Sequence, residues 1–184
     1  YDSLLEVEVV PVGIETYANS RRLEKSFRLQ GADLETEYTA IEAAIQRPLV
    51  KEADFHGKAA HLSQREEDPC TILCTMTLDD LDVSGKTRYP VGISPIIDPA
   101  TGEVPIDSKG RRSYTTGMSY CPSLKKFVVM GYLPKEIAVQ GKSLLIEYFD
   151  EGGDGLYPMT VQIVGKGSLS VSYTHLRAHE TSLH

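Results

Sequence analysis

Two histidines near the end of the chain have the spacing of a metal-binding pair. His175 and His179 lie four residues apart with Glu180 beside them, and on a helix both imidazoles would share one face. Zinc proteases place the acid directly after the first histidine, whereas here it follows the second. This order argues against a zinc centre, so we predict no metal site.

The other candidates for acid–base or nucleophilic chemistry stand alone in the sequence. His56 and His61 flank a predicted helix, where either could act as a general base, although a solvated histidine on a helix surface is the commoner case. Cys70 and Cys74 lack the second pair of ligands that a zinc site needs. With 3 cysteines in the chain, full disulfide pairing is excluded and reduced thiols are expected.

The charged residues exclude some partners. Acids outnumber Lys and Arg by 26 to 19, and a surface that follows phosphates needs the opposite excess, so nucleic acid is not an expected partner. The longest apolar runs are too short to cross a bilayer, so no membrane partner is expected either. A basic cluster from Lys109 to Arg112 could contact an anionic ligand such as a polyglutamyl tail; a charged hairpin is the more ordinary interpretation.

Helical periodicity dominates the first third of the chain. We predict helices over residues 16–30 and 36–46, and a third that begins after a cap at Asp54. Gly31 is the predicted stop of the first helix. These helices would have to position any ligand-binding side chains of this part.

After Pro69 the apolar period changes from helical to two. Within residues 72–78 we expect Cys74, Met76 and Leu78 to share the inner face of a strand. Further strand-like runs, separated by turn signals, cover residues 91–97, 112–117, 126–133, 143–149 and 156–164. The predicted class is therefore α+β, with a helical part followed by a small antiparallel β barrel.

The end of the chain has a different character. Residues 165–168 have the composition of a linker, and residues 171–181 follow neither period. The stretch from about residue 171 resembles one reading frame of a transposase-type sequencing adapter. We therefore predict that residues 171–184 are not evolved sequence and pack against nothing.

Three motifs follow one another along residues 20–134 of the chain. Residues 20–28 read Ser-Arg-Arg-Leu-Glu-Lys-Ser-Phe-Arg, and Ala-Asp-Leu and Thr-Glu-Tyr follow. Residues 54–58 read Asp-Phe-His-Gly-Lys, and residues 130–134 read Met-Gly-Tyr-Leu-Pro. Together these motifs resemble those of the glycine cleavage T-protein (aminomethyltransferase) superfamily. The resemblance covers residues 13–164, and the motif sequences are most similar to those of the FAD-dependent dimethylglycine and sarcosine dehydrogenases.

The resemblance implies a division of the chain and a set of cofactors. Residues 1–69 would be the C-terminal part of the folate-binding domain, residues 70–165 the C-terminal β-barrel domain, and residues 166–184 a linker and the artefactual tail. Tetrahydrofolate is the implied cofactor of the module, and FAD that of a parent protein whose flavin domain lies outside this chain. Folate and a methylated amine are the implied small-molecule partners.

The resemblance also points to ligand-binding residues. The family's glycine after Glu-Lys is Ser26 here, and the arginine that often precedes the motif and helps hold folate in T-proteins has Tyr17 and Ala18 as its counterparts. Tyr17 and Arg22 are therefore the predicted cofactor-binding residues. The alternative for Arg22 is a structural pairing with a nearby acid, which is the commoner role of a charged helix residue.

The predicted function is that of a C-terminal fragment of a tetrahydrofolate-linked aminomethyl-transfer module from a dimethylglycine or sarcosine dehydrogenase-like oxidoreductase. The alternatives are a free-standing aminomethyltransferase and a non-catalytic regulatory or scaffold relative. The family's catalytic aspartate would lie upstream, so no catalytic residue is assigned and the chain alone is expected to be inactive. The expected location is cytoplasmic in a bacterium or the mitochondrial matrix in a eukaryote.

Overall fold

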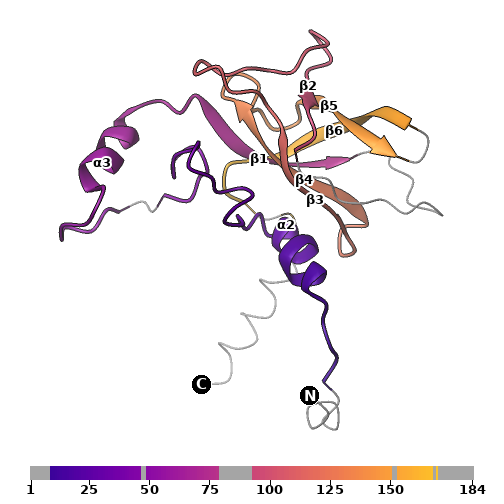
Figure 1. Ribbon diagram of the computed structural model, residues 1–184, viewed down its shortest axis with the longest axis horizontal. Helices are drawn as coiled ribbons and strands as arrows, with labels where there is room; N and C mark the ends of the chain where they lie inside the picture. The colour runs from indigo at the N-terminus through magenta and orange to yellow at the C-terminus, as the bar shows by residue number, and fades with distance from the viewer. Residues whose placement is uncertain (1–8, 47–48, 79–92, 151–152, 168, 170–184) are drawn as a thin grey trace.

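The structure is a computed structural model that describes residues 9–46, 49–78, 93–150, 153–167 and 169. The tail predicted over residues 171–184 and the start of the strand predicted over residues 91–97 lie outside this range. Figure 1 shows a curled sheet with the N-terminal helical run beneath it and a second helix standing apart.

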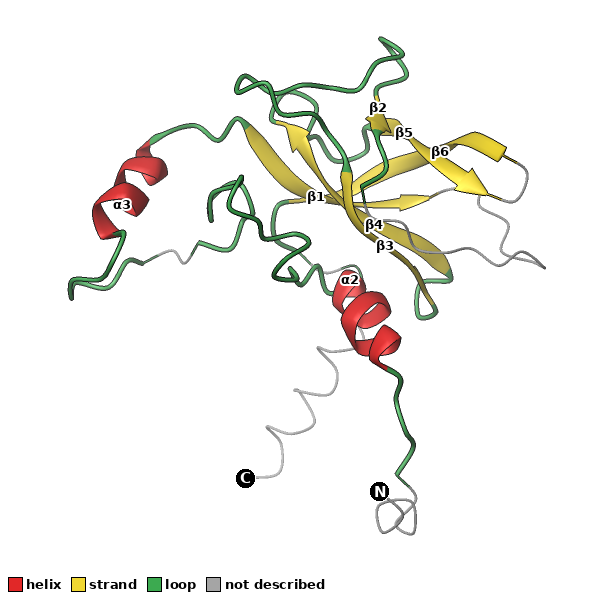
Figure 2. Cartoon of the chain, in the orientation of Figure 1, coloured by secondary structure: helices red, strands yellow, loops and turns green. Residues whose placement is uncertain are grey.

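The described strands form one antiparallel sheet in the order β2-β5-β6-β1-β4-β3. The strands are β1 (Thr71–Leu78), β2 (Ile96–Ile97), β3 (Thr115–Cys121), β4 (Lys126–Pro134), β5 (Ser143–Asp150) and β6 (Gly153–Val164). Every strand run predicted from the sequence overlaps one of them, and the hairpins β3-β4 and β5-β6 are visible in Figure 2. The antiparallel sheet is thus confirmed, and the described chain is mostly strand with only short helices.

The two edges of the sheet meet. Pro95, just before β2, forms an antiparallel bridge with Tyr114, just before β3. The Thr115 amide also donates to the Ser94 carbonyl at 2.9 Å. The predicted barrel is therefore a strongly curled sheet whose edges are joined by a few backbone hydrogen bonds, since β2 is too short for a continuous ladder.

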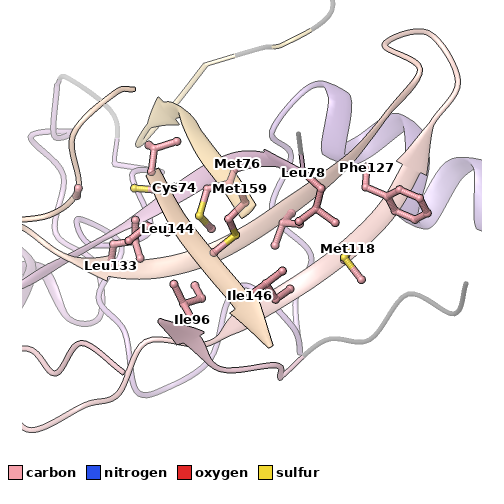
Figure 3. Close-up of a cluster of buried hydrophobic side chains, with 13 residues drawn as sticks. Cys74, Met76, Leu78, Ile96, Met118, Phe127, Leu133, Leu144, Ile146 and Met159 are labelled. Atoms are coloured by element: carbon pink, nitrogen blue, oxygen red, sulfur yellow. The ribbon is translucent and has the colours of Figure 1, made fainter. Parts of the chain in front are cut away.

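The core lies on the inner face of this curl. Cys74, Met76 and Leu78 are buried in a single apolar cluster, as the alternation predicts, and Ile146 and Met159 meet them from β5 and β6 (Figure 3). Side chains at alternate positions of a strand point to opposite faces.

The N-terminal segment covers the outer face of β1 and β4. A second apolar cluster joins Leu23, Tyr38 and Ala43 to residues of the sheet. The sheet contributes Leu73, Cys121, Val128, Met130 and Tyr132 to it. Strand β1 is therefore packed on both faces.

The first helix is shorter than predicted. The helical run consists of η1 (Thr16–Arg21) and α2 (Arg22–Glu24), instead of residues 16–30. Ser26 has a φ of 53°, a left-handed conformation that a helix cannot continue through. The chain turns there, and the amide of Phe27 donates to the Arg22 carbonyl at 2.8 Å.

The second predicted helix, over residues 36–46, is wrong, because this segment consists of turns. The Thr39 amide donates to the Glu42 carboxylate at 2.9 Å, and the Glu42 amide donates to the Thr39 hydroxyl at 3.2 Å. The Glu42 carbonyl then accepts from the Leu73 amide of β1 at 2.9 Å. Hydrogen bonding to the sheet has overridden the helical pattern.

The third predicted helix exists but begins later than Asp54. Helix α3 spans Lys58–Glu66, follows Gly57 with its φ of 83°, and has no buried residue. It stands away from the sheet in Figure 1.

The conformation of Ser26 gives a first prediction. The left-handed backbone costs a non-glycine residue about 1 kcal/mol or more, while the Ser26 hydroxyl gains a buried hydrogen bond with the Thr75 hydroxyl at 2.8 Å, worth about 1 kcal/mol. Because the two effects oppose each other, Ser26→Gly should change the free energy of unfolding by less than about 1 kcal/mol in chemical denaturation. Ser26→Ala keeps the strain and loses the bond, so it should be the less stable variant; the reverse order would show that the backbone there is unstrained.

Candidate functional site

A cavity of about 450 Å³ opens beside the η1–α2 run. Its lining comes from one continuous stretch, residues 17–29, which contains the motif at residues 20–28 and its immediate neighbours. The lining residues are Tyr17, Ala18, Arg21, Arg22, Glu24, Lys25, Phe27, Arg28 and Leu29. The structure therefore brings Tyr17 and Arg22, the two predicted ligand-binding residues, to one pocket.

Two aromatic side chains are largely exposed in the wall of this pocket. Tyr17 is 79% exposed and Phe27 is 65% exposed. Rings of this size usually bury their faces, so exposed rings around a cavity suit a planar ligand or a covering surface.

Arg22 lies deeper in the pocket wall and is only 7% exposed. Its Nη1 lies 2.5 Å from the Asp33 Oδ2 in a buried ion pair. Its Nε donates to the Ala18 carbonyl at 2.5 Å, and Nη1 donates to the Phe27 carbonyl at 3.2 Å. This geometry matches the structural alternative for Arg22, and contact with a ligand stays a prediction.

Asp33 is the centre of the polar network behind the pocket, and it is fully buried. Its Oδ2 accepts from Arg22 and from the Leu29 amide at 2.8 Å. Its Oδ1 accepts from the Thr116 hydroxyl, and its carbonyl accepts from the Tyr132 hydroxyl at 2.7 Å. Asp33 is the acid of the Ala-Asp-Leu part of the family motif, and the sequence alone assigns it no role; its place just after the turn at Gly31 is the available signal.

No protein-family model matches the chain. The aminomethyltransferases of Francisella tularensis (strain WY96-3418) and Francisella philomiragia are each 28% identical to it over 155 residues, covering 80% of this chain and 39% of theirs. This chain is homologous to aminomethyltransferases. The identity is low, and the chain spans about 39% of the length of these relatives.

A solved structure supports the same relationship at the level of the fold. Glycine cleavage system aminomethyltransferase T from Bartonella henselae matches with a TM-score of 0.59 and 24% sequence identity. The match covers 79% of this chain and 36% of that one. The resemblance to the T-protein superfamily is confirmed in this coarse form, whereas its FAD-dependent branch stays a prediction.

The basic cluster of this aminomethyltransferase homologue is a structural site. Arg111 lies 2.5 Å from the Glu42 carboxylate and 2.7 Å from the Asp107 carboxylate. Its guanidinium also lies 4.7 Å from the ring centroid of Tyr38, and Lys109 Nζ lies 3.7 Å from Glu42. The charged-hairpin interpretation therefore fits better than an anion site.

None of the remaining sequence candidates that the structure describes lines this pocket. In the described part of the homologue, no three His, Cys, Asp or Glu residues are placed to hold a metal ion. Burial raises the pKa of Cys74 and of Cys121 to about 12, so neither is a thiolate nucleophile near neutral pH. His56 lies beside α3, and His175 and His179 lie outside the described residues. None of the described helices is long and apolar enough to span a membrane.

Proposed function

We propose that the chain is the C-terminal part of a tetrahydrofolate-linked aminomethyl-transfer module, in which residues 17–29 form one wall of the folate site. The observation that carries this proposal is the pocket itself, because the stretch with the family's motif lines it. The homology to aminomethyltransferases supports the reaction class.

The chemistry of the lining fits tetrahydrofolate. The exposed rings of Tyr17 and Phe27 offer flat apolar surfaces for a bicyclic ring or an aminobenzoyl group. Arg21 and Lys25 add positive charge to the same wall, which suits the carboxylates of the glutamate portion. When bound, tetrahydrofolate accepts the one-carbon unit.

The described residues that line the pocket can bind and shield a ligand, but none of them is an evident proton carrier. Glu24 is the acidic residue of the lining, and it is buried against Arg21 at 3.2 Å and accepts from the Ser123 amide at 3.2 Å. A general base must reach the proton that it moves, and a carboxylate held in this way is a structural group. We place the catalytic carboxylate upstream, as the family resemblance implies.

This proposal predicts that the isolated chain is inactive. With tetrahydrofolate, calorimetry should show binding weaker than micromolar, because only part of the ligand's contact surface is present. Assays with dimethylglycine or sarcosine should show neither oxidation nor one-carbon transfer. Micromolar affinity, or turnover above the buffer rate, would show that the chain carries much more of the site than one wall.

The parent protein is a separate proposal. The amino-acid sequences of the motifs favour an FAD-dependent dimethylglycine or sarcosine dehydrogenase as the parent protein. The names of the relatives favour a free-standing aminomethyltransferase. The coding sequence upstream decides between them, since a Gly-x-Gly-x-x-Gly fingerprint after a strand would identify a dinucleotide-binding domain. A scaffold relative would bind no folate even when joined to its upstream part.

A further inference from the structure

We propose that Asp33 is a positioning residue for the pocket: its buried carboxylate ties the two ends of the lining together and sets the shape of the wall. Asp33 does not line the cavity itself, so it acts through other residues. The inference deepens the proposed function, on which it depends for the identity of the ligand.

The first step is the sharing of one carboxylate oxygen. Asp33 Oδ2 accepts from Arg22 Nη1 at 2.5 Å and from the Leu29 amide at 2.8 Å. Arg22 belongs to helix α2 and Leu29 to the segment after the turn, and both line the cavity. A single atom therefore fixes the distance between the helical and the extended part of the wall.

The second step passes through Arg22 to its neighbours. The guanidinium donates to the carbonyls of Ala18 and Phe27, which are also lining residues. Because a planar guanidinium presents its donors in a fixed fork, its orientation determines where these two backbone segments lie. Asp33 holds that orientation through a charge-assisted bond.

The third step anchors the network to the sheet. The Thr116 hydroxyl and the Tyr132 hydroxyl, from β3 and β4, bind the Asp33 side chain and carbonyl. At Gly117 a Cβ atom would lie 2.6 Å from Arg22 Nη2, so glycine there leaves room for the guanidinium. The pocket wall is thus fixed against a rigid surface.

Packing alone does not require a charged side chain at position 33. An asparagine has a similar shape and one carbonyl oxygen for the same donors, and a neutral group has a smaller desolvation cost than a buried carboxylate. What the charge adds is a stronger hold on Arg22. We therefore expect Asp33→Asn to affect the pocket more than the rest of the fold.

The test is an NMR titration of the full 184-residue chain with tetrahydrofolate up to low millimolar concentration. Asp33→Asn should weaken tetrahydrofolate binding at least tenfold, under conditions where the variant and the unsubstituted chain are both folded. The matched control is Asp98→Asn, since Asp98 is also buried and pairs with Lys142 at 3.1 Å, away from the pocket. The affinity of the control variant for tetrahydrofolate should stay within twofold of that of the unsubstituted chain. If the affinity of Asp33→Asn also stays within twofold, the proposal is overturned.

A double-mutant cycle tests whether Asp33 acts through Arg22. Binding to the Arg22→Gln/Asp33→Asn double variant should be no weaker than binding to Arg22→Gln alone. Losses that multiply would show two independent effects and refute a positioning role. If the unsubstituted chain binds no tetrahydrofolate at all, the proposed function fails.

Hydrogen exchange then tests the positioning role without a ligand. Asp33→Asn should speed exchange of the Leu29 amide at least tenfold more than exchange of the Leu73 amide in β1, which the carboxylate does not touch. Equal acceleration at both amides would mean that Asp33 only stabilises the fold.

Discussion

Replacing Arg111 by alanine is expected to lower the free energy of unfolding by about 3–5 kcal/mol, the cost typical of breaking a buried ion pair. Glu42 and Asp107 are both buried, and Arg111 contacts their carboxylates at 2.5 Å and 2.7 Å. Removal of the guanidinium leaves two negative charges close together in the interior. Among the described residues, Lys109 is the cation that remains beside them, 3.7 Å from Glu42 and half exposed.

The adjacent Arg112→Ala variant is the control, because Arg112 has no ion-pair partner among the described residues. This substitution should lower the free energy of unfolding by no more than about 0.5 kcal/mol. Urea denaturation of both variants measures the difference. Similar losses would mean that the cluster around Arg111 contributes nothing beyond an ordinary surface charge.

Acid titration provides a second measurement on the same variant. Burial alone would raise the pKa of Glu42 and of Asp107, but hydrogen bonds and charge from Arg111 outweigh it and hold both pKa values below their ordinary range. Carboxylates with a lowered pKa stabilise the fold above about pH 4 and lose that contribution as the pH falls through the folded-state pKa. Unsubstituted protein should therefore lose stability below about pH 4, and Arg111→Ala should lose less.

Gly131→Val should be the next most damaging change, with a loss of about 3 kcal/mol or more. A Cβ atom at Gly131 would lie 2.8 Å from the carbonyl oxygen of Tyr114 and 2.8 Å from Ile96 Cδ1. The first contact is to backbone, which cannot rotate away. Tyr114 also takes part in the bridge that joins the sheet edges, so the substitution should push those edges apart.

Gly13→Ala is the matched control for this variant, because a Cβ atom there meets nothing within 4 Å. It should leave the unfolding free energy within about 0.5 kcal/mol. Thermal or chemical denaturation compares the two. A Gly131→Val protein as stable as the control would show that β4 and the segment before β3 have room to separate.

The sheet could be predicted from sequence because its signal is local. Alternation in residues 72–78 placed Cys74, Met76 and Leu78 on one face, and turn signals marked where each later strand ends. The helix predictions were wrong where tertiary contacts determine the backbone conformation. Ser26 occupies a left-handed conformation that favours glycine, and the carbonyl of Glu42 bonds to β1 instead of to a helical turn.

For the candidate site, the resemblance singled out two residues that line the pocket but not the buried acid behind them, for a related reason. Arg22 lies within the motif and Tyr17 lies just before it, so the resemblance could single them out. Asp33 acquires its role from Thr116 and Tyr132, which reach it from distant strands. No pattern in a single sequence indicates which buried acid such hydroxyl groups will meet.

The two-sided packing of β1 has a consequence for synthesis on the ribosome. Leu23, Tyr38 and Ala43 emerge early, but they pack against Val128 and Met130, which are made much later. Until residues 44–127 have also been translated, the earlier segment has no sheet to cover, and its apolar side chains stay open to solvent or chaperones. Translation pauses ahead of β4 would lengthen this exposure and so favour aggregation of nascent chains over folding.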